Sequence, residues 1–154
     1  FPMGIFELAD FTGLDVIHKA TVEMHTRDKK VILPHPTIEQ LFNEKKLGQK
    51  SGEGFYKYSD DKYERIPLSE ELAQKCDPVQ IIANILNNAA WLVTNNASDI
   101  DEIEKAANLG LGLKKPLFDT AKEIGMQKIV EELKKLSNKH GTFYEPDPLL
   151  LSMC

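Results

Sequence analysis

The segment LGQKSGEGFYKY, at residues 47–58, combines glycines, a serine and lysines, the residue types that often bind phosphate groups in a loop. The spacing argues against that chemistry. A loop of the G-x-x-x-x-G-K-[ST] type needs glycine directly before Lys50, where this sequence has glutamine. The dinucleotide pattern G-x-G-x-x-G, which Gly52 and Gly54 could begin, has Lys57 in place of its third glycine. We therefore expect a structural clasp, in which the glycines take positive φ and the following aromatic residues pack on helices.

Other residues with reactive side chains show no catalytic or metal-binding spacing. The histidines form no H-E-x-x-H pattern, so we expect them to be exposed or to cap helices; they are His18, His25, His35 and His140. Ser51 has no positioned base in the sequence that would make it a nucleophile. We predict no catalytic residue, no cofactor-binding residue and no metal ligand in this chain.

Composition narrows the class of protein. The chain has 154 residues, a net charge of −5 and 42% hydrophobic residues, which suits one compact domain or two small helical ones. Its lysines are scattered among acids, so we expect no nucleic-acid partner. No apolar run approaches the roughly 20 residues of a membrane span, so we expect no membrane partner. Two cysteines and no leader-like segment favour the cytoplasm.

The spacing of apolar residues and helix caps predicts an all-α fold. Asp77 followed by Pro78 is typical of a helix start, and apolar residues then recur at helical spacing to Val93. Capping residues, prolines and glycines predict further helices, separated by short turns. Their starts are expected at or near Pro2, Asp15, Thr37, Ser69, Ser98, Pro116 and Gln127. We expect Asp15 and Thr37 to cap their helices, and Gly110 to end the helix that begins near Ser98. The segment GFYKY is the one short stretch that favours an extended conformation.

An internal repeat relates the two halves of the chain. FELADFTGLDVI at 6–17 aligns with FDTAKEIGMQKI at 118–129, and Gly13 and Gly125 are 112 positions apart. The same offset aligns Pro34 with Pro146 and Pro36 with Pro148, also without a gap. Each of these residues is a helix breaker that fixes a turn. We predict two related helical repeats, at 1–76 and 77–154, each incomplete at one end. The opening FPMGIFELAD also has no polar lead-in, so we expect a piece of a longer protein.

The pattern PMGIFELADFTGLDV followed by LGQKSGEGFYKY resembles the C-terminal domain of 3-hydroxyacyl-CoA dehydrogenases. That family typically has P-M-G-P-F-E-L-x-D-x-x-G-L-D, then L-G-[RK]-K-[ST]-G-x-G-F-Y. Ile5 and Gln49 are the two mild departures. The resemblance implies a multihelical fold like the C-terminal domain of 6-phosphogluconate dehydrogenase. The second repeat looks like the additional helical domain of duplicated, multifunctional members.

The resemblance implies oxidation of an L-3-hydroxyacyl-CoA to a 3-ketoacyl-CoA, with hydride passing to NAD, in fatty-acid β-oxidation or related metabolism. In that family NAD and the catalytic His–Glu pair belong to an N-terminal Rossmann domain, which these 154 residues do not contain. This chain would then close the acyl-CoA cleft and mediate contacts in a homo-oligomer. By itself it is expected to be inactive.

Four residues are candidates for binding the acyl-CoA substrate through the complete enzyme. Met3, Gly4 and Phe6 could face the acyl pocket, and Lys50 could approach a CoA phosphate. Core packing and a solvated lysine are the simpler interpretations. A non-catalytic helical dimerisation or interaction module remains the alternative function.

Overall fold

The computed structural model describes residues 3–60, 62–63, 69–75 and 77–154. It contains two compact units, of which one is Met3–Leu68 and the other contains Ser69–Cys154. The predicted boundary after residue 76 falls on a residue outside the described ranges, as does the helix start expected at Pro2. The predicted all-α fold is confirmed, because the only strands in the described residues form one short hairpin.

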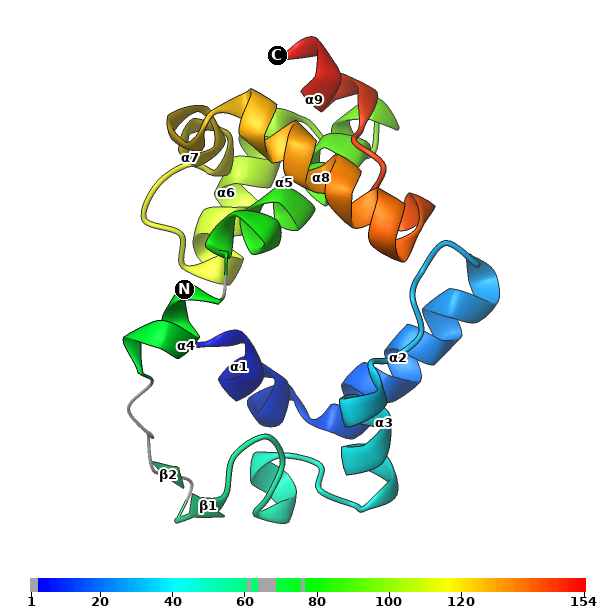
Figure 1. The fold of residues 1–154 in the computed structure, drawn as a ribbon, viewed down its shortest axis with the longest axis vertical. Coiled ribbons are helices and arrows are strands. Elements are labelled where there is room, and N and C mark those ends of the chain that lie inside the picture. Colours follow the sequence, from blue (N-terminus) through cyan, green and yellow to red (C-terminus); the bar gives the residue numbers. More distant parts are fainter. Residues whose placement is uncertain (1–2, 61, 64–68, 76) are drawn as a thin grey trace. The chain divides into compact units, whose positions relative to one another are not determined.

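The Met3–Leu68 unit consists of three helices, a 3₁₀ turn and the hairpin (Figure 1). In chain order its elements are α1 (Ile5–Thr12), α2 (Leu14–Arg27), α3 (Pro36–Asn43), η1 (Gln49–Ser51), β1 (Tyr58–Ser59) and β2 (Lys62–Tyr63). Helices α1 and α3 both pack against α2. The two strands pair antiparallel, with Tyr58 opposite Tyr63.

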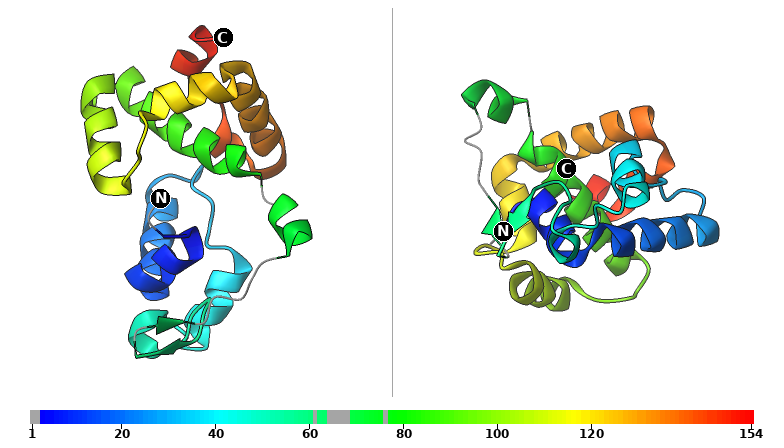
Figure 2. Two further views of the ribbon diagram at one scale, coloured as in Figure 1. Left: turned by 90° about the vertical axis from the view of Figure 1, so that its left-hand side faces the viewer. Right: turned by 90° about the horizontal axis from the view of Figure 1, so that it is seen from below.

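The Ser69–Cys154 unit is built around two helices, α5 (Pro78–Thr94) and α8 (Met126–His140), which lie side by side (Figure 1; Figure 2). Its other elements are α4 (Glu70–Gln74), α6 (Ile100–Leu111), α7 (Leu117–Ile124), η2 (Thr142–Tyr144) and α9 (Pro148–Ser152). The predicted start of α5 is confirmed, because the Asp77 side chain accepts a hydrogen bond from Val79 N at 2.9 Å.

In both units a glycine separates a short helix from the longer helix that follows it. Gly13 separates α1 from α2 with φ of 99°, and Gly125 separates α7 from α8 with φ of 98°. A residue with a side chain would be strained at such angles. The offset of 112 therefore also relates helix starts, since α1, α2 and α3 correspond to α7, α8 and α9. The structure supports the repeat that the sequence predicted.

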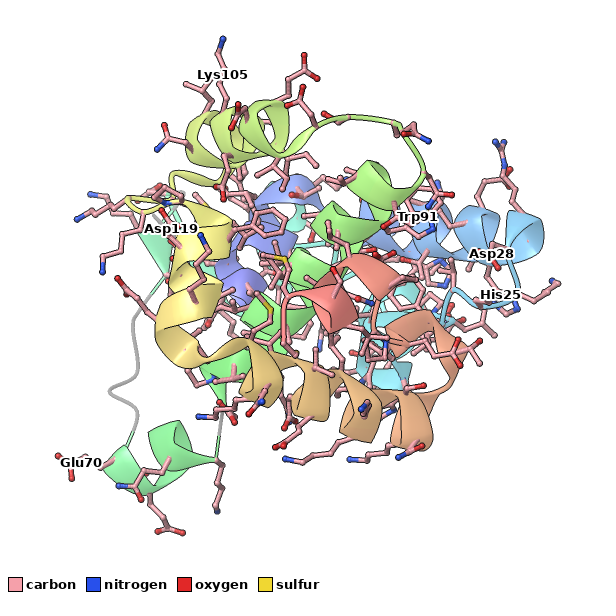
Figure 3. All side chains as sticks on the ribbon, turned by 90° about the horizontal axis from the view of Figure 1, so that it is seen from above. His25, Asp28, Glu70, Trp91, Lys105 and Asp119 are labelled. Atoms are coloured by element: carbon pink, nitrogen blue, oxygen red, sulfur yellow. The ribbon has the colours of Figure 1, made fainter. Side chains whose placement is uncertain are left out.

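The counterparts α1 and α7 nevertheless bury opposite kinds of residue. In α7 the apolar Leu117, Phe118 and Ala121 are buried. Asp119, also in α7, is exposed, as is Lys105 of the neighbouring α6 (Figure 3). In α1 the only buried residue is an acid, Asp10, at 0% exposure. Its large apolar side chains are all exposed, between 45% and 67%; these are Ile5, Phe6, Leu8 and Phe11.

Polar contacts attach α9 to α5 in the second unit. The buried Asn87 side chain donates to Glu145 O at 2.9 Å and accepts from Asp147 N at 2.8 Å. The Asp147 carboxylate in turn accepts from Thr94 Oγ1 at 2.6 Å and from Leu149 N. Burial of these groups is tolerated because each one has a partner.

Three predicted helix limits are wrong. Asp15 lies in the first turn of α2, and the backbone of Gly13 occupies the cap position instead. His35, not Thr37, caps α3, because its Nδ1 accepts from Thr37 N at 3.2 Å. Helix α6 continues through Gly110 and ends before Gly112, whose φ of 62° suits a left-handed cap.

The core of the second unit yields a direct test. Leu133 of α8 is fully buried against α5, so Leu133→Ala should lower the free energy of unfolding by about 2–5 kcal/mol. The neighbouring Lys134 is exposed, and Lys134→Ala should change it by less than about 0.5 kcal/mol. Urea denaturation followed by circular dichroism measures both, and equal effects would contradict this core.

Candidate functional site

The glycine-rich segment 47–58 does surround an anion, and that anion is the carboxylate of Asp10. Asp10 Oδ1 accepts from Phe55 N at 2.9 Å, and Oδ2 accepts from Tyr56 N at 2.9 Å. The Tyr58 hydroxyl adds a third hydrogen bond to Oδ2 at 3.0 Å. Hydrogen bonds to an ionised acceptor are stronger than neutral ones, and here they compensate for burying the charge. We call Asp10 and residues 47–58 the Asp10 clasp.

Two glycines are required because the chain passes too close to Asp10 for any side chain. A β-carbon on Gly48 would overlap the backbone of Asp10, and one on Gly54 would overlap its carboxylate. Gly48 also has φ of 96° and Gly52 has φ of 78°, which confirms the predicted turn. Gly54 does not have a positive φ, so glycine is needed there because a side chain would collide with Asp10.

Hydrogen bonds within the loop fix its shape. Ser51 Oγ accepts from Leu47 N at 2.7 Å and lies 3.0 Å from Gly48 O, closing the turn around η1. Leu47 O accepts from Leu14 N at 3.1 Å, which joins the loop to the first residue of α2. Ser51 is thus engaged in turn structure, which agrees with the absence of a positioned base.

Lys50 forms an ion pair with Asp15 in the first turn of α2. The hydrogen bond from Lys50 lowers the pKa of the Asp15 carboxyl below its ordinary value. The lysine side chain remains 47% exposed, so this pair is a surface contact of modest energy. The ammonium could exchange Asp15 for another anion at little cost.

Aromatic side chains pack along the outer side of the clasp. The rings of Phe6 and Phe55 lie 4.7 Å apart between centroids, and Tyr56 stacks on Tyr63 at 4.4 Å. Phe55 and Tyr56 are half-buried, so the predicted packing of loop aromatics is confirmed. Phe6, by contrast, keeps half of its surface exposed beside Phe55.

The four candidate substrate-binding residues do not form one site. Gly4 caps α1 and is exposed, while Met3 beside it is half-buried. Phe6 follows in the first turn of α1, and its ring contacts the clasp through Phe55. Lys50 lies instead at the start of α2, paired with Asp15. Met3, Gly4 and Phe6 share one end of α1, and Lys50 stands apart.

Asp10 is the residue that the sequence reasoning missed. It is the only acid in the otherwise apolar run LADF at 8–11, which is a weak signal of burial. Its partners lie 45 to 48 positions further along the chain, too far for any local pattern to reveal. The glycine spacing of the loop was visible, but the anion that it surrounds was not.

The prediction that the histidines are exposed or cap helices is confirmed for His35, which caps α3, and for the exposed His140, but it is wrong for His18, whose side chain is only 13% exposed. His18 stacks on Phe42 and its Nε2 lies 2.5 Å from Glu39 Oε2; His25 Nδ1 lies 2.6 Å from Val31 O. Within the described ranges, no three acidic, histidine or cysteine side chains gather as a metal site would require. A search of the same residues for a helix long and apolar enough to cross a bilayer finds none.

Comparison with known proteins finds one family model over this geometry. Residues 1–58 match the family model described as 3-hydroxyacyl-CoA dehydrogenase, C-terminal domain. The match covers 58 of the 154 residues of the chain. The matched segment ends at Tyr58, the last residue of the clasp, so it contains Asp10 together with the whole loop that surrounds it.

Individual relatives agree with this assignment. The chain is 45% identical over 60 residues to the mitochondrial hydroxyacyl-coenzyme A dehydrogenase of Rattus norvegicus, covering 38% of this chain and 19% of that protein. The alpha subunit of the fatty acid oxidation complex of Idiomarina loihiensis is 27% identical over 169 residues, covering 99% of this chain and 24% of the subunit. The chain thus spans about a fifth of the length of the curated relatives it matches.

A solved structure shows the same fold over nearly the whole chain. The crystal structure of 3-hydroxybutyryl-CoA dehydrogenase from Escherichia coli K12 superposes with a TM-score of 0.74 at 18% identity. The match covers 99% of this chain and 51% of that one. The likeness of fold to this solved structure therefore extends beyond residues 1–58 into the second unit.

The Asp10 clasp should dominate the stability of the first unit. In Asp10→Asn one carboxylate oxygen becomes an amide that cannot accept from the facing N–H, so we expect a loss of about 1–3 kcal/mol in unfolding free energy. Tyr58→Phe removes one donor and leaves two, so its loss should be smaller, about 0.5–1.5 kcal/mol. Chemical denaturation measures both, with exposed Asp119→Asn as a control that should be nearly neutral. A neutral Asp10→Asn variant would contradict the clasp.

Close approach at Gly54 predicts a steric effect that backbone strain cannot explain. Gly54→Ala places a methyl group against the Asp10 carboxylate and should cost at least about 1–3 kcal/mol. Gly110 lies inside α6 with open space around it, so Gly110→Ala should instead stabilise by about 0.5–1 kcal/mol. Thermal melts of the two variants should move in opposite directions, and similar shifts would refute the steric argument.

The Tyr58 hydroxyl should titrate late. Burial, and then its hydrogen bond to Asp10, raise the pKa of Tyr58 above the ordinary tyrosine value of about 10. Because the folded-state pKa is raised, its contribution to stability is complete below about pH 10 and is lost as pH rises through the folded-state pKa. Tyrosinate absorbance should show one of the four tyrosines ionising after the others, and Tyr58→Phe should abolish that late phase. A single phase near pH 10 in the folded protein would oppose this assignment.

Proposed function

We propose that this chain acts as the helical C-terminal part of an NAD-dependent L-3-hydroxyacyl-CoA dehydrogenase, in fatty-acid β-oxidation or related CoA-thioester metabolism. The observation that carries the proposal is the match of residues 1–58 to the dehydrogenase C-terminal domain, with the complete Asp10 clasp inside the matched segment. In this role the chain closes the acyl-CoA cleft and contributes subunit contacts. We place the protein in the cytoplasm on its cysteine usage.

The residues of this chain do not suit the NAD site itself. The loop amides that could receive a phosphate, those of Phe55 and Tyr56, are already directed at Asp10. The glycine-rich loop also lacks the dinucleotide spacing, because Lys57 stands in place of the third glycine. NAD would therefore be held by a Rossmann domain of the complete enzyme, where it would accept the hydride. The role of this chain would be to position and enclose the substrate.

Helix α1 is the element best suited to meet the rest of the enzyme. The clasp fixes its one buried side chain, Asp10, and leaves Phe6 and Phe11 exposed at 50% and 67%. Of the four candidate residues, Phe6 combines exposure with support from Phe55, so it is best placed to border an acyl chain. Met3 and Gly4 lie next to it in sequence. Lys50 would reach a CoA phosphate only by leaving Asp15.

The exposed apolar side chains of α1 also favour the alternative function, a non-catalytic helical dimerisation or interaction module. Four large apolar side chains exposed on one short helix are more than the scattered exposed residues of an ordinary surface. This helix would then serve self-association in a homo-oligomer, and catalysis would belong to another protein.

A chimeric enzyme separates these two functions. The chain alone should form no NADH from NAD and 3-hydroxybutyryl-CoA. The chain should be active when it replaces the matching half of the Escherichia coli 3-hydroxybutyryl-CoA dehydrogenase, with which it shares a fold. In the chimera, Phe6→Ser should lower kcat/KM by about tenfold, or about 1.4 kcal/mol, because it removes apolar support for the substrate.

The control is Leu109→Ser, at an exposed leucine of the other unit, which should leave kcat/KM unchanged. A chimera that folds and binds NAD but forms no NADH would contradict the enzyme function. If that chimera also self-associates through α1, as shown by a smaller species for Phe6→Ser in analytical ultracentrifugation, the interaction module would be supported.

A further inference from the structure

Helix α5 carries no charged side chain, although 28% of the residues of the chain are charged. Its 17 residues, PVQIIANILNNAAWLVT, contain no Asp, Glu, Lys or Arg. One side of the helix packs in the core of the second unit through Ala83, Leu86 and Ala90, which are fully buried. The opposite side is partly or fully exposed. A helix that turns this side only to solvent ordinarily has charged residues among the polar ones there.

The exposed side of α5 consists of one tryptophan and a row of side-chain amides. Trp91 is 56% exposed (Figure 3). Asn84 is half-buried, and Asn88 and Asn95 are exposed. Positions 84, 88, 91 and 95 follow the helical spacing, so these side chains lie along one side of the helix. We call these four residues the α5 stripe.

The amides of the α5 stripe are held in place by the helix itself. Asn88 Nδ2 donates to Asn84 O at 2.8 Å, and Asn95 Nδ2 donates to Trp91 O at 2.9 Å. A side-chain amide has two N–H donors and an oxygen that accepts two hydrogen bonds. The local contacts therefore orient the Asn88 and Asn95 side chains without using their full hydrogen-bonding capacity.

The composition of the α5 stripe suits contact with an identical surface. Charged residues are depleted and tryptophan is enriched at the centre of protein interfaces. In a dimer with two-fold symmetry, identical side chains meet at the axis. Identical charges would repel each other there, whereas identical amides can donate to and accept from each other, as paired asparagines do in two-stranded coiled coils. A charge-free stripe of amides is thus complementary to itself.

We propose that the α5 stripe is a contact surface between two copies of this chain. The two α5 helices lie antiparallel across a two-fold axis at Asn88, so Asn88 meets Asn88 of the second copy and Trp91 lies opposite Asn84 of the second copy. Helix α5 is about 25 Å long, so this contact is at or below the low end of the usual interface size of about 1,200–2,000 Å². Association is therefore weak, with Kd on the order of 10⁻⁴ M. This inference does not rest on the dehydrogenase function.

Trp91 is the only tryptophan of the chain, so its fluorescence reports directly on the α5 stripe. Diluting the whole chain from about 1 mM to about 1 µM should convert dimer to monomer in analytical ultracentrifugation. Over the same range Trp91 emission should shift to longer wavelength, because the indole ring becomes solvated. Phe6→Ser, on α1 of the other unit, should leave both changes as they are.

A charge at the centre of the α5 stripe tests the symmetric contact. Asn88→Asp places like charges on either side of the axis and should raise Kd at least about tenfold, with partial recovery at high salt. Asn138→Asp is a matched control, because it makes the same change on an exposed residue of α8, and it should leave Kd unchanged. Both variants should keep the native circular dichroism spectrum.

Four results would overturn the proposal. The chain could remain monomeric up to about 1 mM, where a dimer with this Kd would predominate. It could dimerise without a shift in Trp91 emission. The two aspartate variants could weaken association alike, which would indicate a general effect of charge. Phe6→Ser could abolish association, which would place the contact on α1.

Discussion

A buried carboxylate has to be satisfied by hydrogen bonds, and in the first unit that requirement shapes everything around Asp10. Ionised groups are costly to bury unless donors replace the lost water. Here the donors are two successive backbone amides and the Tyr58 hydroxyl. To bring the amides within reach, the loop has to pass against the backbone of α1, which is why Gly48 and Gly54 have no side chain. The clasp thus substitutes for an apolar core beneath α1.

The two halves of the chain use the same helix order and opposite means of stabilisation. In the second unit, α7 packs with Leu117, Phe118 and Ala121 in a core shared with α5 and α8. In the first unit, α1 exposes its apolar side chains and is held by a polar contact with the loop. The position equivalent to Asp10 is the exposed Lys122, so α7 buries no carboxylate there. A duplicated fold can keep its backbone while the contacts that stabilise it diverge.

Much of the fold could be predicted from the sequence because its signals are local. A cap followed by proline predicted the start of α5, and the paired glycines at 13 and 125 predicted where α1 gives way to α2 and α7 to α8. The positive φ of Gly52 also followed from the glycine-rich composition of the loop. Helix ends were less certain, since Gly110 suits a helix end but lies within α6. There, the left-handed conformation of Gly112 decides where the helix ends.

The site could be predicted only in part, because its decisive contacts join residues far apart in sequence. Asp10 and Phe55 are 45 positions apart, and no spacing rule connects an acid on a helix with amides in a later loop. The same holds for the pairing of Lys50 with Asp15, 35 positions away, which no local pattern in the sequence indicates. Composition suggested an anion-binding loop, and only tertiary structure reveals that the anion belongs to the protein.

Hydrogen–deuterium exchange at the amides of Phe55 and Tyr56 tests the central claim most directly. If both N–H groups donate to Asp10, they should be strongly protected in the native chain although they lie outside any helix or strand. In Asp10→Ala they should exchange at the rate of open amides, while amides in the core of α8 keep their protection. Rapid exchange of both amides in the unaltered protein would contradict the clasp, and so would protection that survives Asp10→Ala.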